Sequence, residues 1–198
     1  MVHWDRRGAR RRIMIQIGIL LGLISIIAIP LEIIKKENLP LKEISGMAKV
    51  SVDGETRIAL IGDDKARIYW LEEGREQSFK DELVERFSLC QTEDFDECNR
   101  MIKKITKNWE GLAADGEGRL FLLQEHTQSI VVAQPDLKGF QHVIHYNFAE
   151  AFESAVSKGA RKVRKNALGE GLILLKNGHV LIAKENFPVA LVEFGPEG

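Results

Sequence analysis

Two stretches of the chain carry one pattern, WEGLAADGEGRLFLLQE at 109–125 and GEGLILLKNGHVLIAKE at 169–185. In both, a Glu-Gly pair opens an apolar run, a turn that contains Gly interrupts it, and a second apolar run ends in Glu. Short apolar runs on either side of such a turn predict a β-hairpin. The two stretches lie sixty positions apart and match without a gap, which indicates an internal repeat.

A third, more distant copy of the pattern precedes these two. The sequence ISGMA at 44–48 stands where the other copies have their Glu-Gly pair, so Gly46 corresponds to Gly111 and Gly171. Each copy predicts an antiparallel meander of three strands with room for a fourth, and Phe140–Phe148 is the expected fourth strand of the second copy. The three expected meanders cover 44–74, 109–148 and 169–198.

Meanders repeated along a chain are typical of propeller blades. We therefore predict a mainly β fold: a partial β-propeller of about three blades of antiparallel meanders with short helical inserts, preceded by one N-terminal transmembrane helix. The turns are expected to be two-residue hairpin turns with positive φ at Gly54, Gly118 and Asn177-Gly178. Helices are expected in the connections, near Ser78–Phe87, Met101–Ile105 and Asn147–Gly159.

The N-terminal part of the chain predicts a membrane anchor. Residues 13–31 contain no charged side chain and would span about 28 Å as a helix, close to the thickness of a bilayer core. Five arginines precede this run, which places the N-terminus in the cytoplasm. A cleaved signal peptide is the alternative, but the run is long and lacks a small-x-small cleavage site.

The expected organisation is a cytoplasmic tail at 1–12, a transmembrane anchor at 13–34, a linker at 35–43 and a propeller-like domain at 44–198. These features predict a single-pass protein of a bacterial inner (cytoplasmic) membrane, with its N-terminus in the cytoplasm and its C-terminal domain periplasmic or otherwise extracytoplasmic. In such a compartment Cys90 and Cys98 can be bonded to each other or free, and their spacing does not decide between the two.

The composition limits the class of function. The 198 residues are 44% hydrophobic and 29% charged, with a formal net charge of −1, which excludes disordered and collagen-like chains. The balance of charge also argues against a general nucleic-acid binder, which usually carries a strongly basic face. No nucleophile elbow, phosphate loop, dinucleotide fingerprint or metalloprotease motif is present.

At ISGMA (44–48) and the two longer repeats, the chain resembles the esterase-like/phytase-like six-bladed propellers of the bacterial envelope. The resemblance covers about residues 44–198, which is roughly half of such a propeller. An open half exposes the apolar faces of its first and third blades, and large apolar patches usually mark an interaction site. A second copy that closes a ring of three plus three blades, or another propeller-completing protein, is the expected partner.

The resemblance also implies a site for a divalent cation. In calcium-dependent propellers of this kind, a Glu of a similar Glu-Gly pair reaches the central channel, which makes Glu110 and Glu170 candidate ligands for Ca²⁺. The alternative is that both hydrogen-bond the backbone of neighbouring blades. Further acids end the second strand of each copy and form either a ring at one mouth of the channel or ordinary turn contacts: Asp63, Asp64, Glu125 and Glu185.

Other candidates carry weaker signals. His126 is a possible acid–base residue without a visible partner, and an ordinary loop histidine is the alternative. His142 and His145 are three apart on an expected strand, so they face opposite sides and cannot chelate one ion together. A basic run before the third copy is either an anion contact or a solvated linker: Arg161, Lys162, Arg164 and Lys165.

Two functions follow from these observations. The first is a membrane-anchored extracytoplasmic β-propeller-like protein that works as a binding or scaffold module. The second is a calcium-dependent esterase or phosphoesterase, a phytase-like hydrolase, that uses Glu110 and Glu170 as metal ligands.

Overall fold

A computed structural model describes residues 36, 38–86, 95–147, 169–184 and 189–195. The chain divides into two compact units, 1–38 and 39–198, and the fold described here belongs to the second. Several predicted features lie outside the described residues: the membrane segment, the helix after Asn147, Glu185, Cys90 with the side chain of Cys98, and the basic run at 161–165. Among the described residues no helix is both long and apolar enough to cross a membrane.

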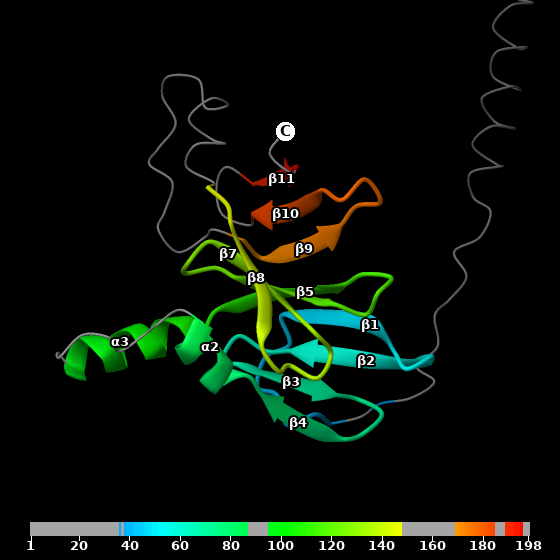
Figure 1. The fold of residues 1–198 in the computed structure, drawn as a ribbon, viewed down its shortest axis with the longest axis horizontal. Coiled ribbons are helices and arrows are strands. Elements are labelled where there is room, and N and C mark those ends of the chain that lie inside the picture. The colour runs from blue at the N-terminus through cyan, green and yellow to red at the C-terminus, as the bar shows by residue number, and fades with distance from the viewer. Residues whose placement is uncertain (1–35, 37, 87–94, 148–168, 185–188, 196–198) are drawn as a thin grey trace, which may run out of the picture. The chain divides into compact units, whose positions relative to one another are not determined.

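Three antiparallel sheets form the described part, one from each predicted repeat, and we call them blades 1, 2 and 3 (Figure 1). Blade 1 consists of β1 (Gly46–Val52), β2 (Glu55–Ile61), β3 (Arg67–Trp70) and β4 (Arg75–Ser78). Blade 2 consists of β5 (Trp109–Ala114), β6 (Leu120–Gln124), β7 (Ser129–Ala133) and β8 (Phe140–His145). Blade 3 consists of β9 (Gly171–Leu174), β10 (Val180–Lys184) and β11 (Ala190–Phe194). The strands of each sheet pair in chain order, so the prediction of a mainly β fold built from meanders is confirmed.

The connection between blades 1 and 2 differs from the prediction at one point. Blade 1 has a fourth strand, β4, which lies beyond the predicted end of that blade at residue 74. Helices α2 (Lys80–Arg86) and α3 (Phe95–Ile105) follow it, as their apolar spacing predicted. The Ser78 side chain accepts a hydrogen bond from the backbone N–H of Lys80 at 3.3 Å, which is the expected N-terminal cap.

The hairpin turns also differ between the blades. Blade 1 has the predicted two-residue turn, with φ of 52° at Asp53 and 80° at Gly54. Gly118 and Gly178 have the predicted positive φ, of 81° and 83°, but each ends a three-residue loop. In the latter two blades the Gly therefore supplies the left-handed residue that closes a longer hairpin loop.

The first strands of adjacent blades touch backbone to backbone. A Cβ on Gly46 of β1 would lie 2.6 Å from the backbone N of Leu112 in β5 and 2.9 Å from the carbonyl carbon of Gly111. A Cβ on Gly111 would in turn lie 3.1 Å from the backbone N of Leu172 in β9. Only glycine fits these two contacts without moving the neighbouring strand, which is the physical reason for Gly at positions 46 and 111.

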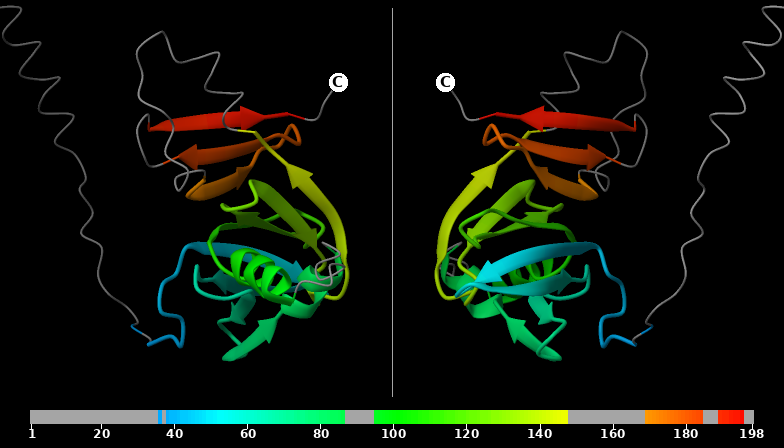
Figure 2. Two further views of the ribbon diagram at one scale, coloured as in Figure 1. Left: turned by 90° about the vertical axis from the view of Figure 1, so that its left-hand side faces the viewer. Right: turned by 90° about the vertical axis from the view of Figure 1, so that its right-hand side faces the viewer.

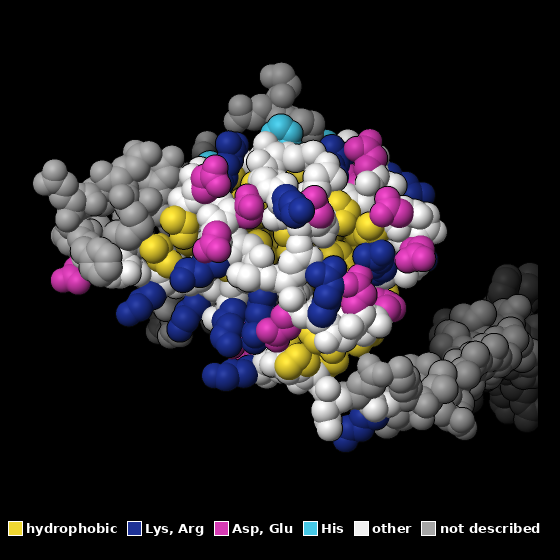
Figure 3. Space-filling view, turned by 60° about the horizontal axis from the view of Figure 1, so that its bottom comes forward, with side chains coloured by type: hydrophobic (Ala, Val, Ile, Leu, Met, Phe, Trp, Pro, Cys, Tyr) yellow, Lys and Arg dark blue, Asp and Glu magenta, His cyan; other side chains and the backbone are white. Residues whose placement is uncertain are grey.

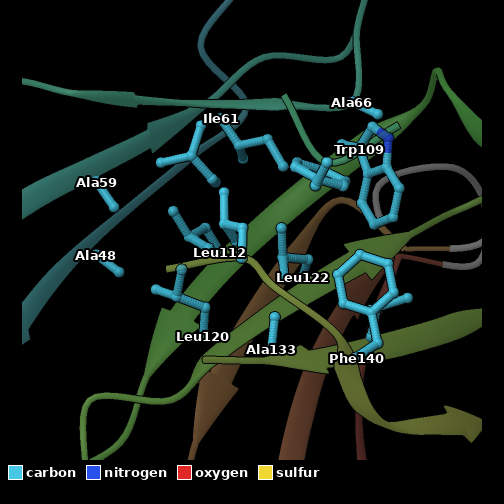
Figure 4. Packing of buried hydrophobic residues seen from close by; sticks show 14 of the residues in the cluster. Ala48, Ala59, Ile61, Ala66, Trp109, Leu112, Leu120, Leu122, Ala133 and Phe140 are labelled. Carbon is cyan, nitrogen blue, oxygen red and sulfur yellow. The ribbon is translucent and has the colours of Figure 1, made fainter. Parts of the chain in front are cut away.

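Two apolar clusters fill the space between the blades. Figure 4 shows the larger one, in which side chains of blade 1 such as Ile61 face side chains of blade 2 such as Leu112 and Leu122. Phe79 and Trp109 join this cluster edge to face, with ring centroids 5.0 Å apart. The smaller cluster lies between blades 2 and 3 and contains Leu123, Ile130, Tyr146, Leu172, Val180 and Ile182. The blades therefore rest on one another through their faces, as Figure 2 shows.

The two outer faces of the stack are not alike. On blade 1, Leu41 packs over Leu60 and Tyr69, which are 3% and 9% exposed, so the predicted exposure of this face is wrong for most of it. The segment before β1 provides this cover. On blade 3 the prediction is correct, because large apolar side chains stay exposed there: Ile173 at 55%, Val189 at 75% and Leu191 at 67%.

The close contact at Gly46 can be tested by substitution. We expect Gly46→Ala to lower the free energy of unfolding by about 1–3 kcal/mol, because its Cβ would force blades 1 and 2 apart. Gly171→Ala is the matched control, since among the described residues its Cβ would meet only the Ala183 Cβ, at an ordinary 3.6 Å. Urea unfolding of both variants measures the difference, and equal losses would contradict the backbone contact.

Candidate functional site

The carboxylates that the repeat predicts lie at one end of the blades. In each blade the start of the first strand pairs with the end of the second: Gly46 with Ile61, Trp109 with Gln124, and Gly171 with Ala183. Acids that precede a first strand or follow a second strand therefore share this end of the stack. We call it the acidic end, and its described members are Glu43, Asp63, Glu110, Glu125 and Glu170.

Glu110 is the electrostatic centre of the acidic end. Partial burial raises the pKa of its carboxyl group to about 7, and the negative charges of Glu170, Glu125, Asp63 and Glu43 add to the effect in that order. A carboxyl group with this pKa is partly protonated at neutral pH, so it can both donate and accept a hydrogen bond or a proton.

Asn108 holds the ends of blades 1 and 2 together. It has a left-handed backbone with φ of 60°, and its N–H donates to the carbonyl oxygen of Asp63 at 2.7 Å. Its own carbonyl accepts from the N–H of Glu125 at 3.0 Å, and its side-chain amide donates to Glu125 Oε2 at 3.3 Å. The sequence analysis missed this residue, although Asn just before a strand is a known signal for a left-handed backbone.

A buried lysine lies on the blade 3 side of the acidic end. Lys184 is only 1% exposed, and burial lowers the pKa of its ammonium group, while the charge of Glu170 partly raises it. Tyr146 is 7% exposed, and burial raises the pKa of its phenol, with further contributions from Glu125 and Glu170. The sequence analysis did not single out either residue, because a lysine at a strand end usually lies in solvent.

The calcium site expected at Glu110 and Glu170 stays a prediction. Among the described residues, no group of three or more His, Cys, Asp or Glu side chains comes close enough together to hold a metal ion. Calcium takes six to eight oxygen ligands, so carboxylates that only influence one another's charge are not sufficient. We therefore derive no chemistry through a metal at Glu110 and Glu170.

The remaining predicted residues are dispersed. His126 is exposed and lines a cavity of about 650 Å³ together with Asn108 and residues of α3. His142 and His145 are exposed on β8, the outer strand of blade 2. Asp64 lies in the turn after β2 and lines a second cavity, of about 590 Å³.

Comparison with known proteins leaves the family open. No protein-family model matches the sequence, and no curated protein is significantly similar to it. The fold is similar to a solved streptogramin B lyase, with 12% identity and a TM-score of 0.39 over 82% of this chain and 43% of that chain. It is also similar to virginiamycin B lyase from Staphylococcus aureus, with 9% identity and a TM-score of 0.36 over 79% and 42% of the two chains.

A further similar structure is the extracellular domain of a protein described as a hybrid two-component system of B. thetaiotaomicron. The identity is 12% and the TM-score 0.43, over 82% of this chain and 17% of that chain. The chain thus spans less than half the length of all three structures. Similarity at this level says nothing about activity, and the description of the blades rests on strand order, register and packing.

The raised pKa of Glu110 predicts a pH-dependent stability. The folded state binds this proton more tightly than the unfolded chain, so the contribution of Glu110 to stability is largest below its ordinary pKa of 4.5 and falls as the pH rises through about 7. We expect Glu110→Gln to raise the free energy of unfolding at pH 8 by about 1–2 kcal/mol, and to change it little at pH 4.5.

Urea unfolding at the two pH values measures this effect. Glu85→Gln, which changes an exposed carboxylate on α2, is the matched control and should give the same difference at both pH values. Equal destabilisation of Glu110→Gln at both pH values would contradict the raised pKa, and a larger loss at pH 8 than at pH 4.5 would show that the charged carboxylate stabilises the fold.

Proposed function

We propose that the protein is a membrane-anchored, extracytoplasmic binding or scaffold protein whose β-propeller-like domain engages a partner through the outer face of blade 3. The anchor is the apolar segment at 13–31 with its preceding arginines. The observation that supports a partner concerns the exposed outer face of blade 3. Its side chains correspond to those of the blade 2 face against which blade 3 packs.

This correspondence can be followed residue by residue. On blade 2, Ala113, Phe121 and Leu123 face blade 3 and pack in the smaller apolar cluster. Sixty positions later the same face of blade 3 carries Ile173, Leu181 and Ala183, none of which is buried. This face therefore has the form of a surface that receives a further blade.

The glycine contact is repeated on this face as well. Gly111 lets the backbone of Leu172 approach closely, whereas an added Cβ on its counterpart Gly171 would have only Ala183 of its own sheet within 4 Å in the part of the chain that the structure describes. A partner strand can thus approach β9 as closely as β9 approaches β5. A blade-like partner fits this geometry, either as a second copy of the chain or as another propeller-completing protein.

The arrangement of two copies follows from the cover on blade 1. A ring that joins blade 3 of one copy to blade 1 of the other has to displace Leu41 from Leu60 and Tyr69. Packing blade 3 against blade 3 about a two-fold axis leaves this cover in place and buries both exposed faces. This second arrangement is the one that we propose for a dimer.

Light scattering on the full chain in detergent tests the partner surface. We expect a dimer for the wild type and a monomer for Leu191→Asp, because each buried, unpaired carboxylate costs several kcal/mol. Ile144→Asp, which changes an exposed apolar residue of β8, is the matched control and should remain dimeric. Met47→Asp on blade 1 distinguishes the two arrangements. It should leave a dimer that packs blade 3 against blade 3 intact, and it should disrupt a ring that joins blade 3 to blade 1. A monomeric wild type would exclude the second copy as partner.

The membrane orientation has its own test. A reporter that fluoresces only in the cytoplasm should stay dark when it is fused after Gly198, and should be bright when it is fused to the N-terminus. Bright fluorescence from the C-terminal fusion would exclude an extracytoplasmic domain.

The hydrolase predicted from the sequence is not favoured by any observation on the described residues. A calcium-dependent esterase needs a cation site, and no group of three or more His, Cys, Asp or Glu side chains among the described residues comes close enough together to suggest one. Hydrolysis of esters or phosphoesters that requires Ca²⁺ and is lost in Glu110→Gln would replace the scaffold proposal with the enzyme.

A further inference from the structure

A cavity of about 590 Å³ lies between blade 1 and the helical connection that follows it. Residues 64–67 after β2, together with Glu76 and Ser78 of β4, form its blade side, and Ile102, Lys103, Thr106 and Lys107 from the end of α3 close it. Its size falls in the range of small-molecule sites. It includes none of the residues that form the acidic end or the outer face of blade 3, although Asp64 directly follows Asp63 and Lys107 directly precedes Asn108 in the sequence.

The charge of this cavity is opposite to that of the chain as a whole. Five basic residues line it, against Asp64 and Glu76, which gives a formal net charge of +3 in a protein with a net charge of −1: Lys65, Arg67, Lys80, Lys103 and Lys107. Figure 3 shows basic side chains gathered on this side of the molecule. The neighbouring cavity at His126 shares Lys103 and adds Arg100 and Lys104. A concave surface with this charge concentrates anions.

The charges in the cavity are largely unneutralised by the described residues. Arg67 pairs with Glu76, but none of the four lysines forms an ion pair with a described side chain. Two buried polar atoms also have no hydrogen-bond partner among the described residues: Arg67 Nε, a donor, and Asp64 Oδ1, an acceptor. Both atoms are closed off from solvent, so a ligand in the cavity would meet the lysine ammonium groups and not these two atoms.

The side chains define the chemistry of that ligand. Lysine ammonium groups act as point charges and suit a phosphate group, whereas the planar fork of the arginine is already partly engaged by Glu76. The carboxylate of Asp64, which also lines the cavity, would repel a phosphate but can accept a hydrogen bond from a hydroxyl group next to it. We propose that this cavity binds a phosphate group carried by a hydroxylated molecule, either a free phosphate ester or the headgroup of an anionic lipid.

Calorimetric titration of the full chain in a neutral detergent tests the proposal, with glucose 6-phosphate for the free ester and dihexanoylphosphatidylglycerol for the headgroup. Lys103→Gln/Lys107→Gln should weaken binding at least about tenfold, the usual effect of losing a charge-assisted hydrogen bond. Lys49→Gln/Lys176→Gln, which removes two exposed lysines elsewhere, is the matched control and should bind as the wild type does.

The role of Asp64 gives a second, independent readout. Asp64→Asn should reduce the preference for glucose 6-phosphate over inorganic phosphate several-fold, because the hydroxyl group then loses a charged acceptor. Glucose and dihexanoylphosphatidylcholine, which lack the net negative charge, should not bind.

Each possible result of these titrations either supports or overturns the proposed phosphate site. Binding of glucose 6-phosphate that depends on Lys103 and Lys107 supports the site with a free ester as ligand. The same dependence with only the phosphatidylglycerol lipid supports it with a headgroup as ligand. No binding of either probe, or binding that is unchanged in the double variant, overturns the proposal, as does equal binding of glucose.

Discussion

The contact on which the rest of the domain depends is the backbone-to-backbone approach of the first strands at Gly46 and Gly111. Each glycine allows the next blade to come within a distance that a Cβ would block. Because the strands meet there, the blade faces close on one another and bury Leu112, Leu122 and Leu172. Burial raises the pKa of Glu110, and the same approach brings together the strand ends whose carboxylates add to this rise. The close approach of the first strands thus determines both the packing between the blades and the electrostatics of the acidic end.

The sequence predicts the repeated part of this fold and fails where the repeat stops. Apolar runs around Gly-containing turns identify the strands of all three blades, because buried strands have an obvious apolar pattern. Strand β4, REQS, has no such pattern, since it is an outer strand that is mostly exposed, and its pairing with β3 defines it. The cover of blade 1 by Leu41 could not be predicted either, because a single leucine in a linker does not indicate where it packs.

The candidate sites also contain a part that the repeat predicts and a part that it does not. Equivalent positions in a repeat lie at equivalent places, so the convergence of Glu110, Glu125 and Glu170 follows from the alignment alone. The burial of Lys184 and the bridging role of Asn108 depend on side-chain packing that differs from blade to blade. The basic cavity is invisible in the sequence, because its lysines come from separate segments and each resembles an ordinary solvated residue.

The length of the repeat explains where such a cavity can arise. Gly46 and Gly111 are sixty-five positions apart, whereas propeller blades usually repeat after about 40–50 residues. The excess lies in the connection that contains α2 and α3, and this segment is not held by the glycine contacts that constrain the strands. Binding residues gather on connections that a rigid scaffold positions. A balanced total charge therefore conceals an acidic end set by the strands and a basic cavity in which Lys80, Lys103 and Lys107 come from the connection.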